Sequence, residues 1–282
     1  MTPPPSTLGA GLRRHDRDRY QTALFAPSER REALFALYAF NYEIARIREA
    51  AREPMMGRMR LQWWRDALDE IYGRVTPRRH EIVQPLAAAI DTYGLSRTHF
   101  TALLDERTRD MEEEPPASLA ALEAYAAGSS GSLISLALEI LGVDSVEARA
   151  AGGAVGTAYA LAGLLVAAPF HARQRRVYLP RALIEHHRLD LDRSLFASKP
   201  SPALAAVARD IAARARACLE EARKHRAALP PAAMPAMLHA VLAERRLRTL
   251  ARVDYDLMDP RLAVADPLQS GRLAWAALRA RF

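Results

Sequence analysis

The stretch GTAYALAGLLVAAPFHARQRRVYLP occupies residues 156–180, and no charged side chain occurs from residue 150 to residue 170. That uncharged length is about what a helix needs to cross a bilayer. Alanine and glycine are frequent in it, however, and these residues contribute little to membrane insertion. Small side chains also let neighbouring helices approach one another closely. The stretch therefore predicts a tightly packed central helix over residues 145–170, in preference to a transmembrane span.

Apolar residues recur at helical spacing on both sides of this stretch. Ser28 and the glutamate after it begin a helix that should run to about Ala51, whereas the prolines at 115 and 116 form a turn. Further helices are predicted near residues 59–71, 80–93, 96–112, 118–142, 203–228 and 232–257. The chain is therefore predicted to be an all-α, single-domain helical bundle around a central cavity. This domain should span residues 17–282, after a flexible N-terminus of residues 1–16.

The composition limits the partners and the compartment. Lys and Arg number 40 against 33 Asp and Glu, and the net charge of +7 suits phosphorylated ligands, nucleic acid or anionic lipid headgroups. Arginine and glutamate are interspersed, as on an ordinary solvated surface, and no nucleic-acid partner is expected. The single cysteine, Cys218, excludes an internal disulfide and suits a reducing compartment. Because the N-terminus does not resemble a signal peptide, the protein is expected to be cytoplasmic.

Residues 38–49, YAFNYEIARIRE, and the stretch 156–180 resemble two motifs of the squalene and phytoene synthase family. The resemblance covers about residues 17–280 and implies the all-helical trans-isoprenyl diphosphate synthase fold. In active members, aspartates three or four residues apart share one helix face. These carboxylates hold Mg²⁺ ions, which grip a diphosphate leaving group.

The same resemblance shows which functional positions differ in this chain. In the first motif, the cysteine, arginine and aspartate positions hold Asn41, Tyr42, Ala45, Arg46 and Glu49. In the second motif, the polar positions hold Ala160, Gly163, Val166, Ala167 and His171. One carboxylate of the first motif, Glu49, remains where three would be expected, so the Mg²⁺ ions that neutralise the charge on a leaving diphosphate would not be held. No catalytic residue, cofactor or metal site is therefore expected, and Mg²⁺ would be needed only by an active enzyme.

Four separate runs favour one branch of this family. They are FNYE at 40–43, MRLQWWR at 59–65, PFH at 169–171 with RRVYLP at 175–180, and RVDYD at 252–256. These runs resemble the mitochondrial complex I assembly factor 6 group, which has also lost the aspartate motifs. The resemblance implies a catalytically degenerate assembly factor or chaperone whose partners are respiratory complex I subunits or assembly intermediates. The alternative is an active Mg²⁺-dependent head-to-head prenyl transferase acting on farnesyl or geranylgeranyl diphosphate.

Candidate binding residues follow from these motifs. The cavity, with walls expected near Tyr38 and Gly156, is a candidate site for an isoprenoid or a segment of a partner. The ligand-binding candidates are Tyr38, Asn41, Tyr42, Arg176 and Tyr178. Arginine binds phosphate bidentately, so five arginines are candidates for holding a prenyl diphosphate without activating it: Arg46, Arg48, Arg173, Arg175 and Arg176. The partner-binding candidates, with alternating charges near a helix end, are Arg252, Asp254 and Asp256.

Three further features have more than one interpretation. Four carboxylates either form a displaced acidic cluster or lie on exposed helix faces, which we favour: Glu43, Glu49, Asp66 and Asp69. Arg65 and Asp110 are predicted to pair across helices. The basic, amphipathic segment 271–282 is short and should dock on the core. Its alternative is a membrane-surface helix with Trp275 and Phe282 at the interface, which would attach the protein peripherally to the inner membrane.

Overall fold

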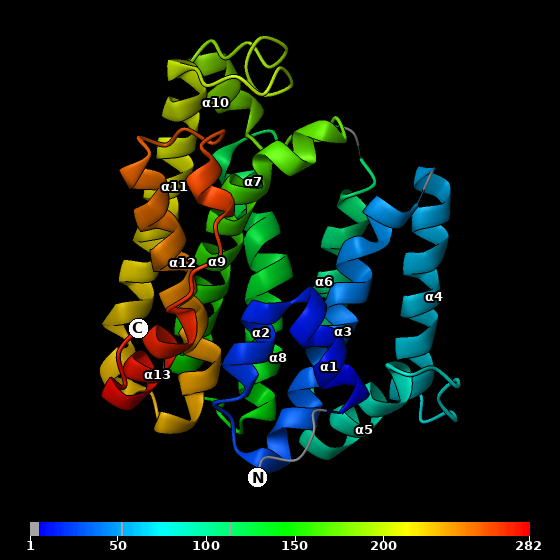
Figure 1. The fold of residues 1–282 in the computed structure, drawn as a ribbon. Helices are drawn as coiled ribbons and strands as arrows, with labels where there is room; N and C mark the ends of the chain where they lie inside the picture. The colour runs from blue at the N-terminus through cyan, green and yellow to red at the C-terminus, as the bar shows by residue number, and fades with distance from the viewer. Residues whose placement is uncertain (1–5, 52, 113) are drawn as a thin grey trace.

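The computed structural model describes residues 6–51, 53–112 and 114–282. Within these ranges the chain forms thirteen α-helices and no strand, and the prediction of an all-α fold is confirmed. The α-helices are α1 (Thr7–His15), α2 (Arg17–Ala23), α3 (Ser28–Ala50), α4 (Pro54–Tyr72), α5 (Val83–Tyr93), α6 (Arg97–Arg109), α7 (Leu119–Ala126), α8 (Ser132–Ile140), α9 (Val146–Arg173), α10 (Arg181–His186), α11 (Pro202–Lys224), α12 (Met234–Arg252) and α13 (Gln269–Arg279). The long helices run roughly parallel, and α10 lies at the upper end (Figure 1).

Helix α9 forms the centre of the bundle. It packs against α8, α11 and α12, and its residues Val155 and Leu161 are completely buried. Ser145 caps its first turn, because the serine hydroxyl accepts a hydrogen bond from the Ala148 amide at 3.1 Å. The helix is long and apolar enough to cross a membrane, yet 56% of its apolar 18-residue stretch is buried inside the protein. This burial fits the packed central helix that the sequence predicts.

Gly156 allows α9 to touch the backbone of the segment between α7 and α8. Residues 118–142 are predicted as one helix, but residues Ala127–Gly131 form a π-helix, η1, between α7 and α8. A Cβ atom on Gly156 would lie 2.5 Å from the Ser130 carbonyl oxygen and 2.7 Å from the Gly131 Cα atom. The cavity wall expected at Gly156 is therefore a close contact between two backbones.

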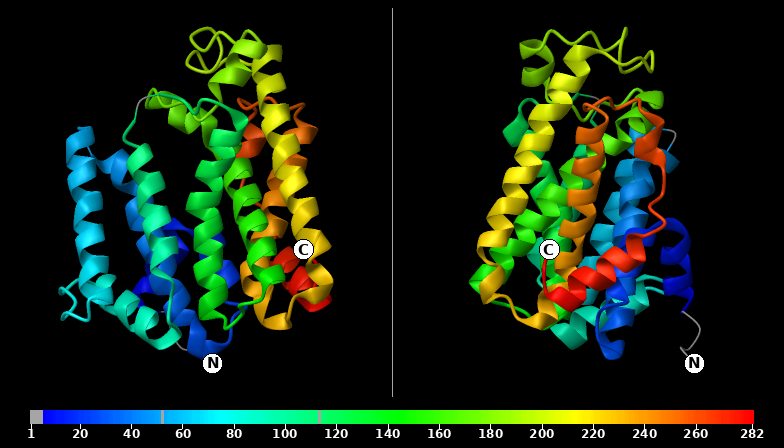
Figure 2. Two further views of the ribbon diagram at one scale, coloured as in Figure 1. Left: turned by 180° about the vertical axis from the view of Figure 1, so that it is seen from behind. Right: turned by 60° about the vertical axis from the view of Figure 1, so that its left-hand side comes forward.

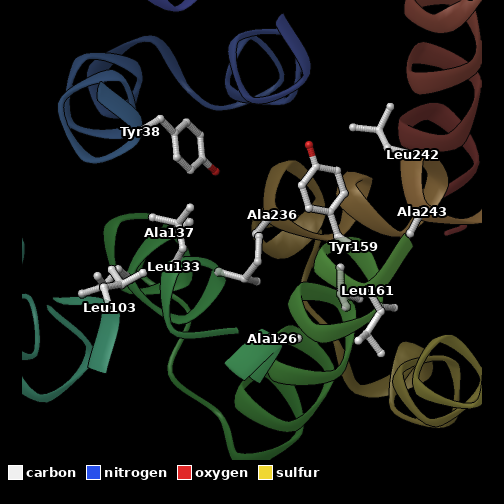
Figure 3. Packing of buried hydrophobic residues seen from close by; sticks show 14 of the residues in the cluster. Tyr38, Leu103, Ala126, Leu133, Ala137, Tyr159, Leu161, Ala236, Leu242 and Ala243 are labelled. Carbon is white, nitrogen blue, oxygen red and sulfur yellow. The ribbon is translucent and has the colours of Figure 1, made fainter. Parts of the chain in front are cut away.

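A half-buried polar cluster joins the N-terminal helices to α9 and α12. The Asp18 carboxylate accepts hydrogen bonds from Arg246 at 2.6 Å, Gln269 at 2.7 Å and the Tyr159 hydroxyl at 3.1 Å. Although burial opposes ionisation, these partners hold the pKa of Asp18 below its usual value. Tyr38 and Tyr159 turn their hydroxyl groups toward the same interior space (Figure 3). The cluster ties residues that are far apart in sequence to one core.

His239 lies next to this cluster and is completely buried. Its ring is 6.2 Å from the Tyr38 ring and 5.1 Å from the Tyr159 ring, and its Nδ1 atom lies 3.0 Å from the Ala236 carbonyl oxygen. Its Nε2 atom has no hydrogen-bond partner among the described residues. Burial, reinforced by the nearby Arg19 guanidinium, lowers the pKa of His239 to about 4. The ring is therefore neutral in the folded protein at neutral pH.

The low pKa of His239 predicts acid sensitivity. An unfolded histidine gains its proton near pH 6.5, whereas folded His239 gains it only near pH 4. The free energy of unfolding should therefore fall as the pH is lowered from about 6.5 to about 4, by up to about 1.4 kcal/mol per unit. Urea unfolding at pH 4.5, 5.5 and 7 checks this, and His239→Leu should reduce the slope. If the free energy of unfolding depended on pH as steeply in His239→Leu as in the wild type, His239 would not be the group responsible. Some pH dependence should remain in the variant, because the pKa of His171 is also lowered to about 4.

Both terminal segments pack on the bundle. The prediction of a flexible segment over residues 1–16 is wrong for Thr7–His15, which form α1, because Leu12 is buried against the core and α1 packs on α3. Residues 1–5 of that segment lie outside the described residues. At the other end, α13 packs on α12 through the fully buried Leu273, and docking of this segment is confirmed.

Candidate functional site

The candidate site is a cavity of about 600 Å³, lined by Arg48, Asp110, Tyr125, Arg176 and Tyr178 together with neighbouring residues. We call it the Asp110 cavity. It lies between the C-terminal ends of α3 and α6, the helix α7 and the loop that follows α9, toward the upper end of the bundle in Figure 1. The sequence predicts a central cavity, and this one lies instead toward one end.

Asp110 organises the polar wall of this cavity and is only 3% exposed. Its Oδ1 atom accepts hydrogen bonds from the hydroxyls of Tyr178 at 2.7 Å and Tyr125 at 2.9 Å, and from Arg176 at 3.2 Å. Its Oδ2 atom accepts one from Arg107 at 3.1 Å. Burial raises the pKa of both tyrosines far above the usual value, so their hydroxyls remain protonated donors. Four donors, two of them cationic, thus converge on one carboxylate.

The predicted pair between Arg65 and Asp110 is wrong. Arg65 donates to Asp105 at 2.7 Å instead, across α4 and α6. Positions 105 and 110 are separated by about 140° around a helix, so the two carboxylates face different neighbours. The sequence does contain a local indication of the true partner, because Arg107 precedes Asp110 by three residues, a spacing at which helical ion pairs form.

Two of the five ligand-binding candidates, Arg176 and Tyr178, line the Asp110 cavity. Tyr38 and Asn41 are buried in the core one turn or more before the end of α3, at 1% and 4% exposure. Tyr42 stacks on His15 of α1, with ring centroids 5.3 Å apart. A ligand-binding role for these three residues remains a prediction, in surroundings separate from the cavity.

The five arginines considered for phosphate binding divide into two groups. Arg48, Arg175 and Arg176 line the cavity, and the Nε atom of Arg48 is buried with no hydrogen-bond partner among the described residues. Arg46 pairs with Glu43 at 3.3 Å and lines a different, smaller hollow, while the side chain of Arg173 is exposed. The cavity therefore gathers cations from α3 and from the loop after α9.

The positions where the family carries metal-binding aspartates offer few oxygen donors. On α3, Ala45 is half-buried while Arg46 and Glu49 are exposed. On α9, Ala167 is half-buried, and burial with Arg176 nearby lowers the pKa of His171 to about 4. The His171 ring lies 4.8 Å from the Tyr178 ring. It is a neutral, packed side chain at neutral pH.

The described residues do not fit a Mg²⁺ site of the kind that active members of the resembled family have. Magnesium prefers carboxylate oxygens, and both oxygens of Asp110 already accept hydrogen bonds from cations or hydroxyls. Three acids of the suggested displaced cluster have other partners: Glu43 with Arg46, Asp66 with Gln62, and Asp69 with Arg97. Among the described residues, no three His, Cys, Asp or Glu side chains meet closely enough to hold a metal ion.

The partner-binding candidates lie on the surface where α12 ends. Arg252 and Asp254 are exposed, whereas Asp256 is half-buried and its side chain accepts a hydrogen bond from the Met258 amide at 2.9 Å. Arg252 also lines a hollow between α12 and α13. Two of the three side chains are therefore accessible, and their role in partner binding remains a prediction.

Comparison with solved structures identifies the fold class. A dehydrosqualene synthase matches with a TM-score of 0.83 over 96% of this chain and 94% of that chain, at 17% identity. Squalene synthase HpnC from Alicyclobacillus acidocaldarius matches with a TM-score of 0.76 over 88% of this chain and 95% of that chain, at 23% identity. The helices surrounding the Asp110 cavity thus have the terpenoid synthase fold.

The sequence comparisons then identify the family. The family model described as squalene/phytoene synthase matches residues 12–279, and this chain belongs to that family. Proteins named NADH dehydrogenase (ubiquinone) complex I, assembly factor 6, from Bos taurus and Homo sapiens are 33% and 32% identical to it over 251 residues, which are 89% of this chain and 75% of each relative. A presqualene diphosphate synthase from Sinorhizobium fredii is 28% identical over 162 residues, 57% of each chain. The predicted resemblance is confirmed.

Proposed function

We propose that this protein is a catalytically degenerate member of its family that assists the assembly of respiratory complex I. The observation that carries the proposal is the similarity to complex I assembly factor 6 over 89% of the chain, at up to 33% identity. The site agrees with it, because the Asp110 carboxylate already accepts hydrogen bonds from two arginines and two tyrosines, whose positive charge and donors oppose the binding of a cation there. Its partners would be complex I subunits or assembly intermediates.

We propose the Asp110 cavity as the place where an isoprenoid or a segment of a partner binds. Its volume of about 600 Å³ is within the range of small-ligand sites. Five arginines and three acidic side chains line it, and Arg48 forms no ion pair with a described carboxylate, whereas Arg109 pairs with Glu106 and Arg175 with Asp192. These cations favour a ligand with an anionic end, such as a prenyl diphosphate or an acidic peptide. In this proposal the ligand is held and not ionised.

Deletion of the gene in its source organism tests the assembly role. We expect loss of most NADH:quinone reductase activity from membranes, and loss of the fully assembled complex on native gels, because assembly intermediates would accumulate. The wild-type gene supplied on a plasmid should restore both, and succinate:quinone reductase serves as the control for membrane integrity. Normal amounts of assembled complex I in the deletion strain would overturn the proposal and favour a lipid-binding role unrelated to complex I.

The competing function is that of a Mg²⁺-dependent prenyl transferase, which the more distant similarity to presqualene diphosphate synthase supports. Purified protein incubated with farnesyl or geranylgeranyl diphosphate and Mg²⁺ should release no pyrophosphate above a no-enzyme control. Turnover near the rates typical of enzymes, above about 1 s⁻¹, would establish the competing function instead. An active presqualene diphosphate synthase assayed in parallel ensures that the substrates are competent.

The proposed location is the cytoplasm, with peripheral attachment to the inner membrane. This location agrees with an assembly partner that is itself a membrane complex.

A further inference from the structure

Helix α13 has two apolar faces, and only one of them packs on the protein. Leu273 and Ala276 on its inner face are buried against the core. On its outer face, Trp275 is 57% exposed and Leu278 is 80% exposed. Positions three apart are neighbours on a helix surface, so the two large side chains form one outward stripe. Packing on the core therefore explains the apolar residues of the inner face, whereas Trp275 and Leu278 form an apolar stripe that stays accessible to a partner.

Arginines flank this stripe. The hollow between α12 and α13 has a volume of about 540 Å³ and is lined by seven arginine side chains and two acidic side chains. Each carboxylate is already shared by two arginines: Glu244 by Arg223 and Arg248, and Asp266 by Arg245 and Arg272. The remaining three cations therefore dominate the charge of the hollow.

These three cations are Arg252, Arg279 and Arg281, which are exposed and form no ion pair with a described carboxylate. Arg279 lies over the Trp275 ring, with its guanidinium carbon 4.3 Å from the ring centroid. A positive charge is thus held beside the exposed indole, an arrangement in which the ring can enter an apolar layer while the guanidinium stays at its polar boundary.

The positive surface continues on the other side of α13. A second hollow, of about 720 Å³, lies between α13 and the N-terminal helices, and the exposed Arg13 and Arg17 line it with the 41% exposed Leu24. The right-hand view of Figure 2 shows α13 crossing between α12 and these N-terminal helices. The exposed stripe of Trp275 and Leu278 therefore lies on a helix with arginine-lined hollows on both sides.

We propose that this face, made of α13 with the arginines beside it, binds the surface of an anionic lipid bilayer. Arginines contact the lipid phosphates, and Trp275 and Leu278 enter the interfacial layer, where tryptophan is favoured. Charge complementarity selects anionic lipid, and the exposed leucine next to the indole favours a bilayer over a nucleic acid. The inference deepens the proposed function by giving it a place of action, and it can fail independently of that function.

Vesicle flotation of the full-length protein tests the proposal. We expect binding to phosphatidylcholine vesicles that contain 30 mol% phosphatidylglycerol, and little binding to pure phosphatidylcholine. A juxtamembrane arginine contributes about fivefold in affinity, so the triple variant Arg252→Gln, Arg279→Gln, Arg281→Gln should bind roughly a hundredfold more weakly. The matched control is Arg58→Gln, Arg79→Gln, Arg193→Gln, which removes three exposed charges elsewhere and should bind as wild type. Equal losses in both variants would overturn the assignment of the face.

Tryptophan fluorescence separates insertion from simple charge attraction. Of the three tryptophans, Trp64 is buried and Trp63 half-buried, so a blue shift on adding anionic vesicles should come from Trp275. The shift should disappear in Trp275→Phe while vesicle binding persists. A shift that persists in Trp275→Phe, or tighter binding to a single-stranded RNA than to vesicles, would overturn the proposal. If the protein does not bind vesicles but complex I still fails to assemble without the gene, the assembly role stands and only the membrane proposal is wrong.

Discussion

Replacing Asp110 with alanine is expected to lower the free energy of unfolding by about 3–5 kcal/mol. The variant leaves Arg107 and Arg176 without their carboxylate in a buried site, and it removes the acceptor for the hydroxyls of Tyr125 and Tyr178. An uncompensated buried cation costs far more than the loss of a surface ion pair. For a protein of this size, the loss corresponds to a decrease in melting temperature of roughly 10 °C, measurable by circular dichroism.

The matched control for this prediction is Asp105→Ala on the same helix. Asp105 also pairs with an arginine, Arg65, at 2.7 Å, but its side chain is 57% exposed. The control should therefore change the free energy of unfolding by at most about 1 kcal/mol. Asp110→Asn, which keeps the shape and removes the charge, should fall between the two. Equal stabilities of Asp110→Ala and Asp105→Ala would show that the Asp110 cluster does not stabilise the fold.

A second large effect is expected at Gly156, where alanine should destabilise the protein by about 2–3 kcal/mol. The added methyl group would lie 2.5 Å from the Ser130 carbonyl oxygen and 2.7 Å from the Gly131 backbone. Both neighbours are backbone atoms of η1, so the clash is relieved only by moving α9 away from that segment. This cost exceeds the gain of about 1 kcal/mol that alanine normally brings to a helix interior.

Gly153→Ala, on the same helix, is expected to change the free energy of unfolding in the opposite direction. A Cβ atom on Gly153 would meet no atom within 4 Å, so only the helix propensity changes. We expect a gain of up to about 1 kcal/mol for this variant, measured by urea unfolding beside Gly156→Ala. If the two variants shifted stability in the same direction, the close contact between α9 and η1 would not be as described.

The elements that follow from local patterns were predictable from the sequence. The serine–glutamate start and the helical spacing of apolar residues predicted a helix over residues 28–51, where the structure has α3 at Ser28–Ala50, and small uncharged residues marked α9 as the central helix. The π-helix η1 was not predictable, because AGSSG is compatible with an ordinary helical turn and only packing against Gly156 reveals the difference. Helix α1 was missed because Leu12 gains its partners from α3, which sequence spacing alone does not show.

The candidate site was predictable only in part. The family motifs led to Arg176 and Tyr178, which line the cavity. The motifs did not lead to Tyr125, and the predicted partner of Asp110, Arg65, is on the wrong helix. Tertiary packing brings α6, α7 and the loop after α9 together, and local sequence patterns do not show it. Tyr38 stands in a recognisable motif and yet is buried, since the motif belongs to α3 and its start faces the core.

The donors near Asp110 and the second family motif would oppose the introduction of a cation site by single substitutions. The substitution Ala45→Asp would create a carboxylate one helical turn from Arg48, close enough for the two to pair. Ala167→Asp would likewise stand one turn from His171. Each introduced acid would first meet a resident side chain, an arginine in one case and a neutral histidine in the other, so introducing the two carboxylates one at a time would gain nothing for a metal. Metal binding at these positions would therefore require the arginine to be replaced before the aspartates are introduced, so no single substitution would be favoured by metal binding alone.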